Sequence, residues 1–140
     1  MKQIPVIFWT GTGNTQMMAD AVAEAINAAG AEAVVKNVSE ITADEAAGYD
    51  ALAFGCPAMG AEVLEECEFE PFFTELEGKL AGKKVALFGS YGWGGSYMQD
   101  WEARVKDAGA TLVADGVLAL GAPDDEAVAK LAEAGKLLAE

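Results

Sequence analysis

The chain has 140 residues, of which 52% are hydrophobic, and 9 Lys and Arg residues against 23 Asp and Glu residues give it a formal net charge of −14 at pH 7. This length suits a single globular domain over 1–140 with one core, and the negative charge disfavours nucleic acid and anionic membranes as partners. The sequence contains no histidine, which excludes Ser-His and Cys-His catalysis and removes the commonest general base at neutral pH.

The apolar runs and the cysteines indicate the cellular location of the protein and whether it binds a metal. The first apolar run, 4–9, is too short for a secretory signal, and no later run approaches the length of a membrane-spanning helix. Cys56 and Cys67 lack the CxxC spacing of a metal or redox site, so two reduced thiols are expected. These features predict a cytoplasmic protein with no metal site.

The first predicted unit is a strand, a loop and a helix. Apolar residues on consecutive positions predict a buried strand over 3–9, and Pro5, which cannot donate a backbone hydrogen bond, is expected at the strand's start. After the loop 10–15, an apolar stripe predicts an amphipathic helix that ends at Gly30. The stripe consists of Met18, Ala21, Val22, Ala25, Ile26 and Ala29.

The alternation of strand and helix continues to the end of the chain. Further strands are predicted over 33–38, 51–55 and 84–89 and within 111–120, and helices over 42–48, 69–80, 97–108 and 124–139. Gly116 is the residue that would interrupt the last strand, and Met98, Trp101 and Val105 are expected to face inward. Because alternating elements imply right-handed crossovers, we predict a three-layer α/β sandwich: a five-stranded parallel sheet with helices on both faces.

Three loops follow strands at the edge of the sheet where open α/β folds bind ligands. Their sequences are TGTGNT (10–15), CPAMGAEVLEE (56–66) and SYGWGGS (90–96). The first places hydroxyl and amide groups between glycines before a helix, which favours binding of one terminal phosphate by neutral donors. It matches neither GxxxxGK[ST] nor GxGxxG, and an ordinary capped turn is the alternative.

The other two loops suggest a flat ligand. Tyr91 and Trp93 stand among glycines, which let a backbone approach a ring closely. Met59, beside Gly60, has a polarizable side chain that can cover the face of a ring. Each aromatic residue alone is more often core or surface, but their meeting at one edge indicates a site for a planar aromatic ligand.

Three segments resemble a known family. WTGTGNT (9–15), GCPAMGAEVLEECEFEPFF (55–73) and KKVALFGSYGWGG (83–95) are similar to the short-chain flavodoxins, most closely the clostridial type, and their spacing matches along nearly the whole chain. The resemblance implies a single flavodoxin-like domain with strand order 2-1-3-4-5 and FMN at the switch point, as is general for that fold. It implies a low-potential one-electron carrier that binds FMN non-covalently and shuttles electrons between redox proteins.

The same resemblance implies the site residues. The FMN phosphate is expected to lie on Thr10, Gly11, Thr12, Gly13, Asn14 and Thr15. The isoalloxazine ring is expected between Met59 and Trp93, with further contacts from Ala58, Gly60, Ala61, Glu62, Ser90, Tyr91, Gly92 and Gly94. Of these, Glu62 resembles the glutamate that accepts a hydrogen bond from flavin N3–H, and Gly60 the residue whose carbonyl turns toward N5 when the semiquinone forms.

Three residues depart from the family pattern. Pro57 stands in place of a serine that helps bind phosphate, Gly121 in place of an asparagine that often approaches the ring, and Ala61 in place of an aspartate. A type II turn needs positive φ at Ala61, whereas a type II′ turn needs it at Gly60. Since alanine resists positive φ by about 1–2 kcal/mol, Ala61 is expected to favour the type II′ arrangement before reduction.

An acidic run borders the predicted flavin edge. It consists of Glu62, Glu65, Glu66, Glu68 and Glu70. Such a run is often only a solvated face, but it would also oppose the negative charge of reduced flavin and attract redox partners with basic docking surfaces. The sequence thus predicts an acidic, monomeric electron carrier without catalytic residues of its own.

Two other functions fit the same fold. An FMN-dependent NAD(P)H:quinone reductase would need an open flavin face, whereas Met59 and Trp93 are expected to cover both faces. A phosphoacceptor signalling domain would need an aspartate at the end of the third strand, where this chain has Gly55 and Cys56. The electron carrier is therefore the preferred interpretation.

Overall fold

The structure is a computed structural model that describes residues 2–11, 13–57, 64–65, 67–91 and 96–140. The strands are β1 (Gln3–Phe8), β2 (Glu32–Asn37), β3 (Ala51–Gly55), β4 (Lys84–Tyr91), β5 (Thr111–Leu112) and β6 (Val117–Leu120). The helices are α1 (Asn14–Ala28), α2 (Ala43–Ala47), α3 (Phe69–Glu77), α4 (Ser96–Asp107) and α5 (Asp125–Ala139), with a 3₁₀ turn over Val38–Glu40.

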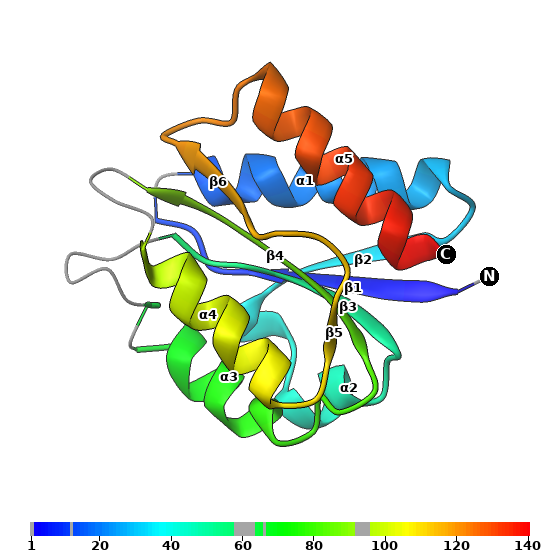
Figure 1. The fold of residues 1–140 in the computed structure, drawn as a ribbon, viewed down its shortest axis with the longest axis vertical. Coiled ribbons are helices and arrows are strands. Elements are labelled where there is room, and N and C mark those ends of the chain that lie inside the picture. The colour runs from blue at the N-terminus through cyan, green and yellow to red at the C-terminus, as the bar shows by residue number, and fades with distance from the viewer. Residues whose placement is uncertain (1, 12, 58–63, 66, 92–95) are drawn as a thin grey trace.

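The β-sheet forms the middle layer of the molecule (Figure 1). Its order is β2-β1-β3-β4-β5, and each described strand pair is parallel. Helices α1 and α5 cover one face, while α2, α3 and α4 cover the other. The predicted three-layer α/β sandwich and its strand order are confirmed.

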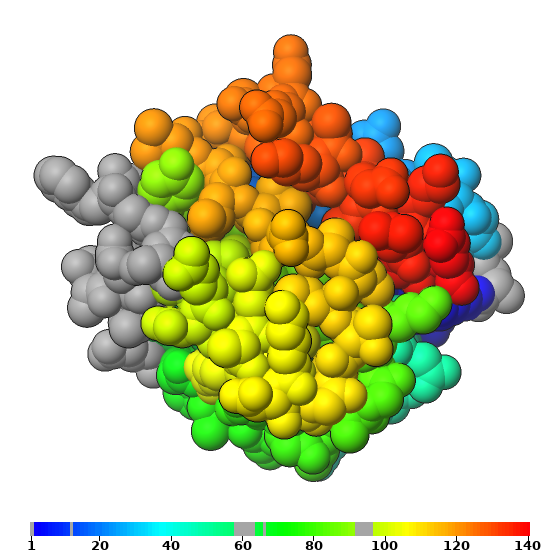
Figure 2. All heavy atoms as spheres, in the orientation of Figure 1, coloured from blue at the N-terminus to red at the C-terminus, as the bar shows by residue number. Residues whose placement is uncertain are grey.

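The last strand position is divided in two. β5 pairs with the start of β4, Lys84 opposite Thr111, and β6 pairs with its end, Phe88 opposite Val117. Between them, the Gly116 N–H donates to Glu102 Oε2 at 2.7 Å, and a Cβ on Gly116 would overlap the sulfur of Met98. The break predicted at Gly116 therefore lets the chain lie close against α4. Residues of α4, β5 and β6 (yellow to orange) occupy the centre of the face in Figure 2.

Pro5 lies inside β1, opposite Val34, and not at the strand's first residue as predicted. The Trp9 N–H donates to Gly55 O at 3.0 Å, and because N–H groups alternate along a strand, the Pro5 nitrogen faces β3 as well. Pairing of β1 with β3 begins only at Val6. In the described part of the sheet, no hydrogen bond between β1 and β3 therefore needs the backbone N–H that Pro5 lacks.

The two faces of the sheet have different cores. Under α1 and α5 the side chains are mostly small and aliphatic. Under α2, α3 and α4 lies an aromatic cluster, in which the Phe69 and Trp101 ring centroids are 5.5 Å apart at 88° and those of Phe54 and Phe73 are 5.4 Å apart at 90°. Both arrangements are the edge-to-face geometry that aromatic rings prefer.

Two predicted helix faces can be compared with the buried side chains. In α4, the inward residues Met98, Trp101 and Val105 are buried as predicted. In α1 the predicted stripe is only partly right: Met18, Val22 and Ile26 are buried, but Ala29 is exposed and lies beyond the helix end. The buried face also includes Ala19 and Ala23, because α1 packs against α5 as well as against the sheet.

Candidate functional site

The three predicted site loops leave the sheet at the same edge. β1, β3 and β4 are parallel neighbours, so their carboxyl ends lie side by side (Figure 1). The Trp9 N–H donates to Gly55 O at 3.0 Å, and the Cys56 N–H donates to Phe88 O at 3.1 Å. The hydrogen bonding of β1 with β3 and of β3 with β4 therefore continues to the residues where the loops begin. Of the predicted site residues, Thr12, Ala58, Met59, Gly60, Ala61, Glu62, Gly92, Trp93 and Gly94 lie outside the described residues.

The first loop leads into the open N-terminus of α1. Gly13 is the N-cap residue, in the left-handed region at φ 93° and ψ −9°, where glycine is favoured. Its N–H donates to Thr10 Oγ1 at 2.9 Å. Among the residues that the structure describes, no side chain caps α1, and its first turn carries no acidic residue.

These features fit a terminal phosphate held by neutral donors. The first N–H groups of a helix have no partner within it, and the helix dipole favours an anion at that end. At α1 a carboxylate that would compete with the anion is absent from the first turn. The side-chain cap that an ordinary capped turn would supply is not found among the described residues at α1.

Thr15 and Ser90 hold the first loop against β4. Their hydroxyl oxygens lie 3.2 Å apart, and the two residues are 1% and 6% exposed. Because a buried hydroxyl costs free energy unless it is hydrogen-bonded, this pair stabilises the junction between α1 and the end of β4. Direct side-chain contacts of Thr15 or Ser90 with a cofactor stay predictions.

The second loop is joined at its base by Cys56 and Glu65. The Glu65 N–H donates to Cys56 Sγ at 3.3 Å, and burial raises the pKa of the Cys56 thiol to about 12. The Glu65 carboxylate, on a residue that is 5% exposed, accepts N–H bonds from Cys67, Glu68 and Phe69 at 2.7, 2.7 and 2.9 Å. Burial opposes ionisation of Glu65, but these three donors hold its pKa below the usual value.

Two glutamates of the acidic run, Glu65 and Glu70, are less exposed than the sequence suggested, whereas Glu68 is exposed. Glu65 serves the start of α3, and Glu70 pairs with Arg104 at 2.8 Å. Arg104 also pairs with Glu77 at 2.9 Å, which ties α3 to α4. Glu62 and Glu66 lie outside the described residues. Glu65 lies three residues before Glu68, the N-cap residue of α3, so its bonds to the start of this helix could not be predicted from the usual N-cap signals.

Two further residues of the site edge have clear positions. Tyr91 ends β4, and its carbonyl accepts the N–H of Gly121 at 3.1 Å. Gly121, one of the residues that depart from the family pattern, therefore lies beside Tyr91 at the end of β4, and its φ of 71° is in the left-handed region. The expected ring contacts from this loop stay predictions.

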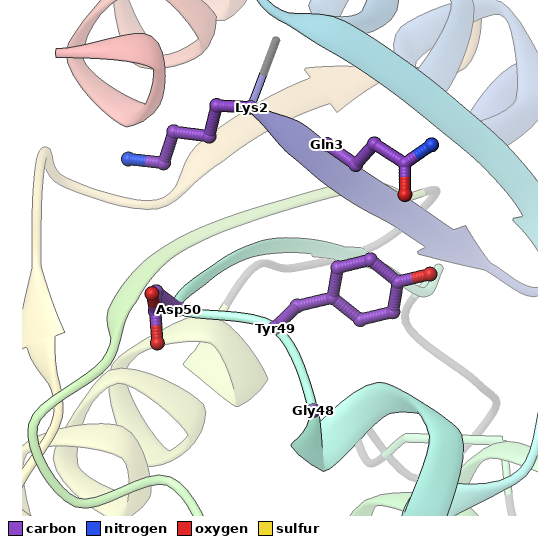
Figure 3. A pocket seen from close by; sticks show the side chains of 5 residues that line it. All are labelled: Lys2, Gln3, Gly48, Tyr49 and Asp50. Atoms are coloured by element: carbon purple, nitrogen blue, oxygen red, sulfur yellow. The ribbon is translucent and has the colours of Figure 1, made fainter.

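A separate cavity lies at the opposite edge of the sheet. It has a volume of about 270 Å³ and is lined by Lys2, Gln3, Gly48, Tyr49 and Asp50 (Figure 3). These residues stand at the amino ends of β1 and β3, so the length of the sheet separates the cavity from the three loops. The cavity does not belong to the predicted site.

Two other kinds of feature are absent from the residues that the structure describes. In this part of the chain, no helix is both long enough and apolar enough to cross a membrane. No group of three or more Cys, Asp or Glu residues among them could hold a metal ion.

Comparisons with known proteins agree with the fold. A family model described as flavodoxin matches residues 6–135. The chain is 47% identical to a flavodoxin of Clostridium beijerinckii over 135 residues, covering 96% of this chain and 97% of that protein. It is 46% identical to a flavodoxin of Megasphaera elsdenii over 116 residues, covering 82% and 85%. The solution structure of two-electron reduced Megasphaera elsdenii flavodoxin matches with a TM-score of 0.89 and 42% identity, over 97% of this chain and 98% of that one.

Proposed function

Because this chain belongs to the flavodoxin family, we propose that it binds FMN non-covalently and carries single electrons at low potential between redox proteins. The observation that carries the proposal is the open N-terminus of α1, which stands at the same edge as the segments that follow β3 and β4. Bound FMN would supply the one-electron chemistry, while the chain binds and orients it.

The phosphate of FMN would lie at the start of α1. The N–H groups of Asn14 and Thr15 stand at the positive end of the helix dipole, and the left-handed Gly13 turns the loop into the helix. Thr10 fixes Gly13 through its hydroxyl. The whole of 10–15 is proposed as the phosphate loop, and the ring contacts from 58–62 and 90–94 form the second part of the same proposal.

Flavin binding tests this function directly. The purified protein is mixed with FMN and, separately, with riboflavin, which has the ring but no phosphate, and the dissociation constants are measured from flavin fluorescence and visible absorption. FMN is expected to bind more tightly than riboflavin, and dithionite is expected to reduce the bound flavin in two resolved one-electron steps. A colourless protein that does not bind added FMN would contradict the proposal. Turnover of NADPH with a quinone would contradict the assignment as a carrier.

The partners are proposed to be redox proteins with basic docking surfaces. The net charge of −14 favours such partners, because complementary charge raises the association rate. The rate of electron transfer to a basic partner is expected to fall as ionic strength rises. A rate that does not change with salt would contradict this part of the proposal. The single domain, the monomeric state and the cytoplasmic location predicted from the sequence belong to the same proposal.

A further inference from the structure

Cys56 is hydrogen-bonded through three of its polar groups. It follows β3 directly and is 0% exposed. Its N–H donates to Phe88 O at 3.1 Å, its carbonyl accepts the hydroxyl of Tyr97 at 2.8 Å, and its sulfur accepts the N–H of Glu65 at 3.3 Å. One buried residue thus binds to three other segments of the chain.

Two of these partners stand at the far ends of the segments expected to hold the flavin ring. Glu65 closes the segment 57–64, which begins directly after Cys56. Tyr97 comes directly after the segment 92–96, which follows β4. Cys56 therefore joins the base of one segment to the end of the other.

The Tyr97 side chain has little freedom to move. It is 2% exposed, and its ring stacks on Trp101 with centroids 6.4 Å apart and an interplanar angle of 27°. A Cβ on Gly89 would overlap both the Tyr97 hydroxyl and the Cys56 carbonyl, so the hydroxyl reaches the carbonyl directly over the glycine backbone. Close packing of this kind leaves a single position for the hydroxyl.

We propose that Cys56 and Tyr97 are positioning residues for the flavin ring, because they form a buried anchor that joins the described ends of the two segments expected to hold the ring. This inference rests on the proposed function and assigns the two residues no contact with the phosphate. The phosphate loop is anchored independently, through Thr10 with Gly13 and through Thr15 with Ser90. Loss of the anchor should therefore weaken ring binding and leave phosphate binding intact.

Tyr97→Phe removes the hydroxyl and keeps the aromatic ring. Because a buried carbonyl loses its donor, we expect the dissociation constants of riboflavin and FMN to rise together by about tenfold. The ratio between the two constants should stay as in the wild type, since that ratio reports the phosphate contact. Tyr49→Phe, at the opposite edge of the sheet, is the matched control and should change neither constant.

A general loss of stability must be separated from a loss of positioning. Asp124→Ala removes the N-cap of α5, whose carboxylate accepts the Ala127 N–H at 2.8 Å, and is expected to lower stability with no change in flavin affinity. If Asp124→Ala weakens riboflavin binding as much as Tyr97→Phe does, or if Tyr97→Phe binds riboflavin as tightly as the wild type, the positioning role is overturned.

Cys56 is tested by a pair of small substitutions. Cys56→Ala removes the acceptor of the Glu65 N–H, whereas Cys56→Ser keeps an acceptor at that position. In the protein without flavin, hydrogen exchange of the Glu65 amide should accelerate in Cys56→Ala and remain slow in Cys56→Ser. Riboflavin should bind more weakly to Cys56→Ala than to Cys56→Ser, although serine buries the more polar group. The reverse order would overturn the role of the sulfur.

The two proposals fail in different ways. If the wild type binds neither FMN nor riboflavin, the proposed function is wrong and the positioning role falls with it. If the wild type binds both flavins and the Tyr97 and Cys56 variants bind them equally well, only the positioning role is wrong.

Discussion

Helices α1 and α5 lie on the same face of the sheet (Figure 1). Each is 15 residues long, but their N-termini differ in capping and in charge. At α5, Asp124 accepts the N–H of Ala127 at 2.8 Å, and Asp125 and Glu126 follow in the first turn. At α1, the N-cap is Gly13, the first turn carries no acidic residue, and no side chain from the described part of the chain caps it. The chain itself compensates the positive end of α5, whereas the described residues supply no such compensation at α1, where we propose that the phosphate binds.

The difference does not come from the surroundings of the two helices. They pack against each other so closely that a Cβ on Gly135 of α5 would lie 2.8 Å from the carbonyl of Val22 on α1. Both bury an apolar face in the same core. The two helices therefore share their packing but differ in the charge of their first turns. Each can serve as a control for substitutions at the N-terminus of the other.

The largest expected effect is on FMN affinity, when the first turn of α1 is given a negative charge like that of the first turn of α5. Asn14 is the first residue of α1, as Asp125 is of α5, and Asn14→Asp changes charge with almost no change in shape. A carboxylate about 5 Å from a phosphate dianion should weaken FMN binding by about 3 kcal/mol, roughly a hundredfold. Riboflavin, which has no phosphate, should bind as before.

Titration of both flavins checks this prediction. An equal loss for FMN and riboflavin would place the phosphate elsewhere. The effect should also shrink as salt is added, since the start of α1 is partly exposed to solvent.

The N-terminus of helix α3 differs from those of α1 and α5. There the carboxylate of Glu65, which precedes the helix, accepts three backbone N–H groups. The pKa of Glu65 is lower in the folded chain than in the unfolded one, so its stabilisation is fully present above the unfolded value. It is lost as pH falls through the folded value. Glu65→Gln should lower the free energy of unfolding at pH 7 by about 2 kcal/mol.

The difference between Glu65→Gln and the wild type should disappear under acid conditions. Urea unfolding from pH 7 down to pH 3 measures it, with Glu24→Gln, an exposed residue of α1, as the control. If the difference in the free energy of unfolding stayed constant over this range, the charge of Glu65 would not be what stabilises the N-terminus of α3.

The shape of the α1 start is tested by Gly13→Ala. The φ of 93° at Gly13 is unfavourable for alanine, although a Cβ there would meet nothing within 4 Å. The strain alone should lower the free energy of unfolding by about 1–2 kcal/mol. Gly78→Ala, at the end of α3 with φ −71° and equally open space, should be neutral or slightly stabilising. Equal effects of the two substitutions would show that the left-handed conformation carries no cost.

The sequence could predict these helices because their signals are local. Runs of apolar residues marked the strands, and β3 begins and ends as predicted, at Ala51 and Gly55. Asp124 before an apolar periodic stretch marked the start of α5. The glycines and hydroxyl residues of 10–15 marked the loop before α1, although an ordinary capped turn also fitted these residues.

Contacts between distant segments were not predictable in this way. Tyr97 and Cys56 are 41 residues apart, and neither a tyrosine at the start of a helix nor a cysteine after a strand indicates the other. The burial of Glu65 was missed because a run of five glutamates reads as solvated. The place of Pro5 in β1 depends on where β3 begins to pair with it, which is set by the whole sheet and leaves no mark on the sequence around the proline.

The smallest predicted effect is a reciprocal exchange of charge between the two helix starts. Without flavin, Asn14→Asp adds a carboxylate at the positive end of α1 and should raise the free energy of unfolding by about 0.5 kcal/mol, while Asp125→Asn should lower it by about the same amount. Thermal unfolding of the two variants should therefore shift in opposite directions by about 1–2 °C. With FMN present, Asn14→Asp should reverse sign and become the less stable variant, because bound ligand stabilises the folded state in proportion to its affinity, whereas Asp125→Asn should keep its sign. If α1 responded to FMN as α5 does, the open helix start would not be the phosphate site.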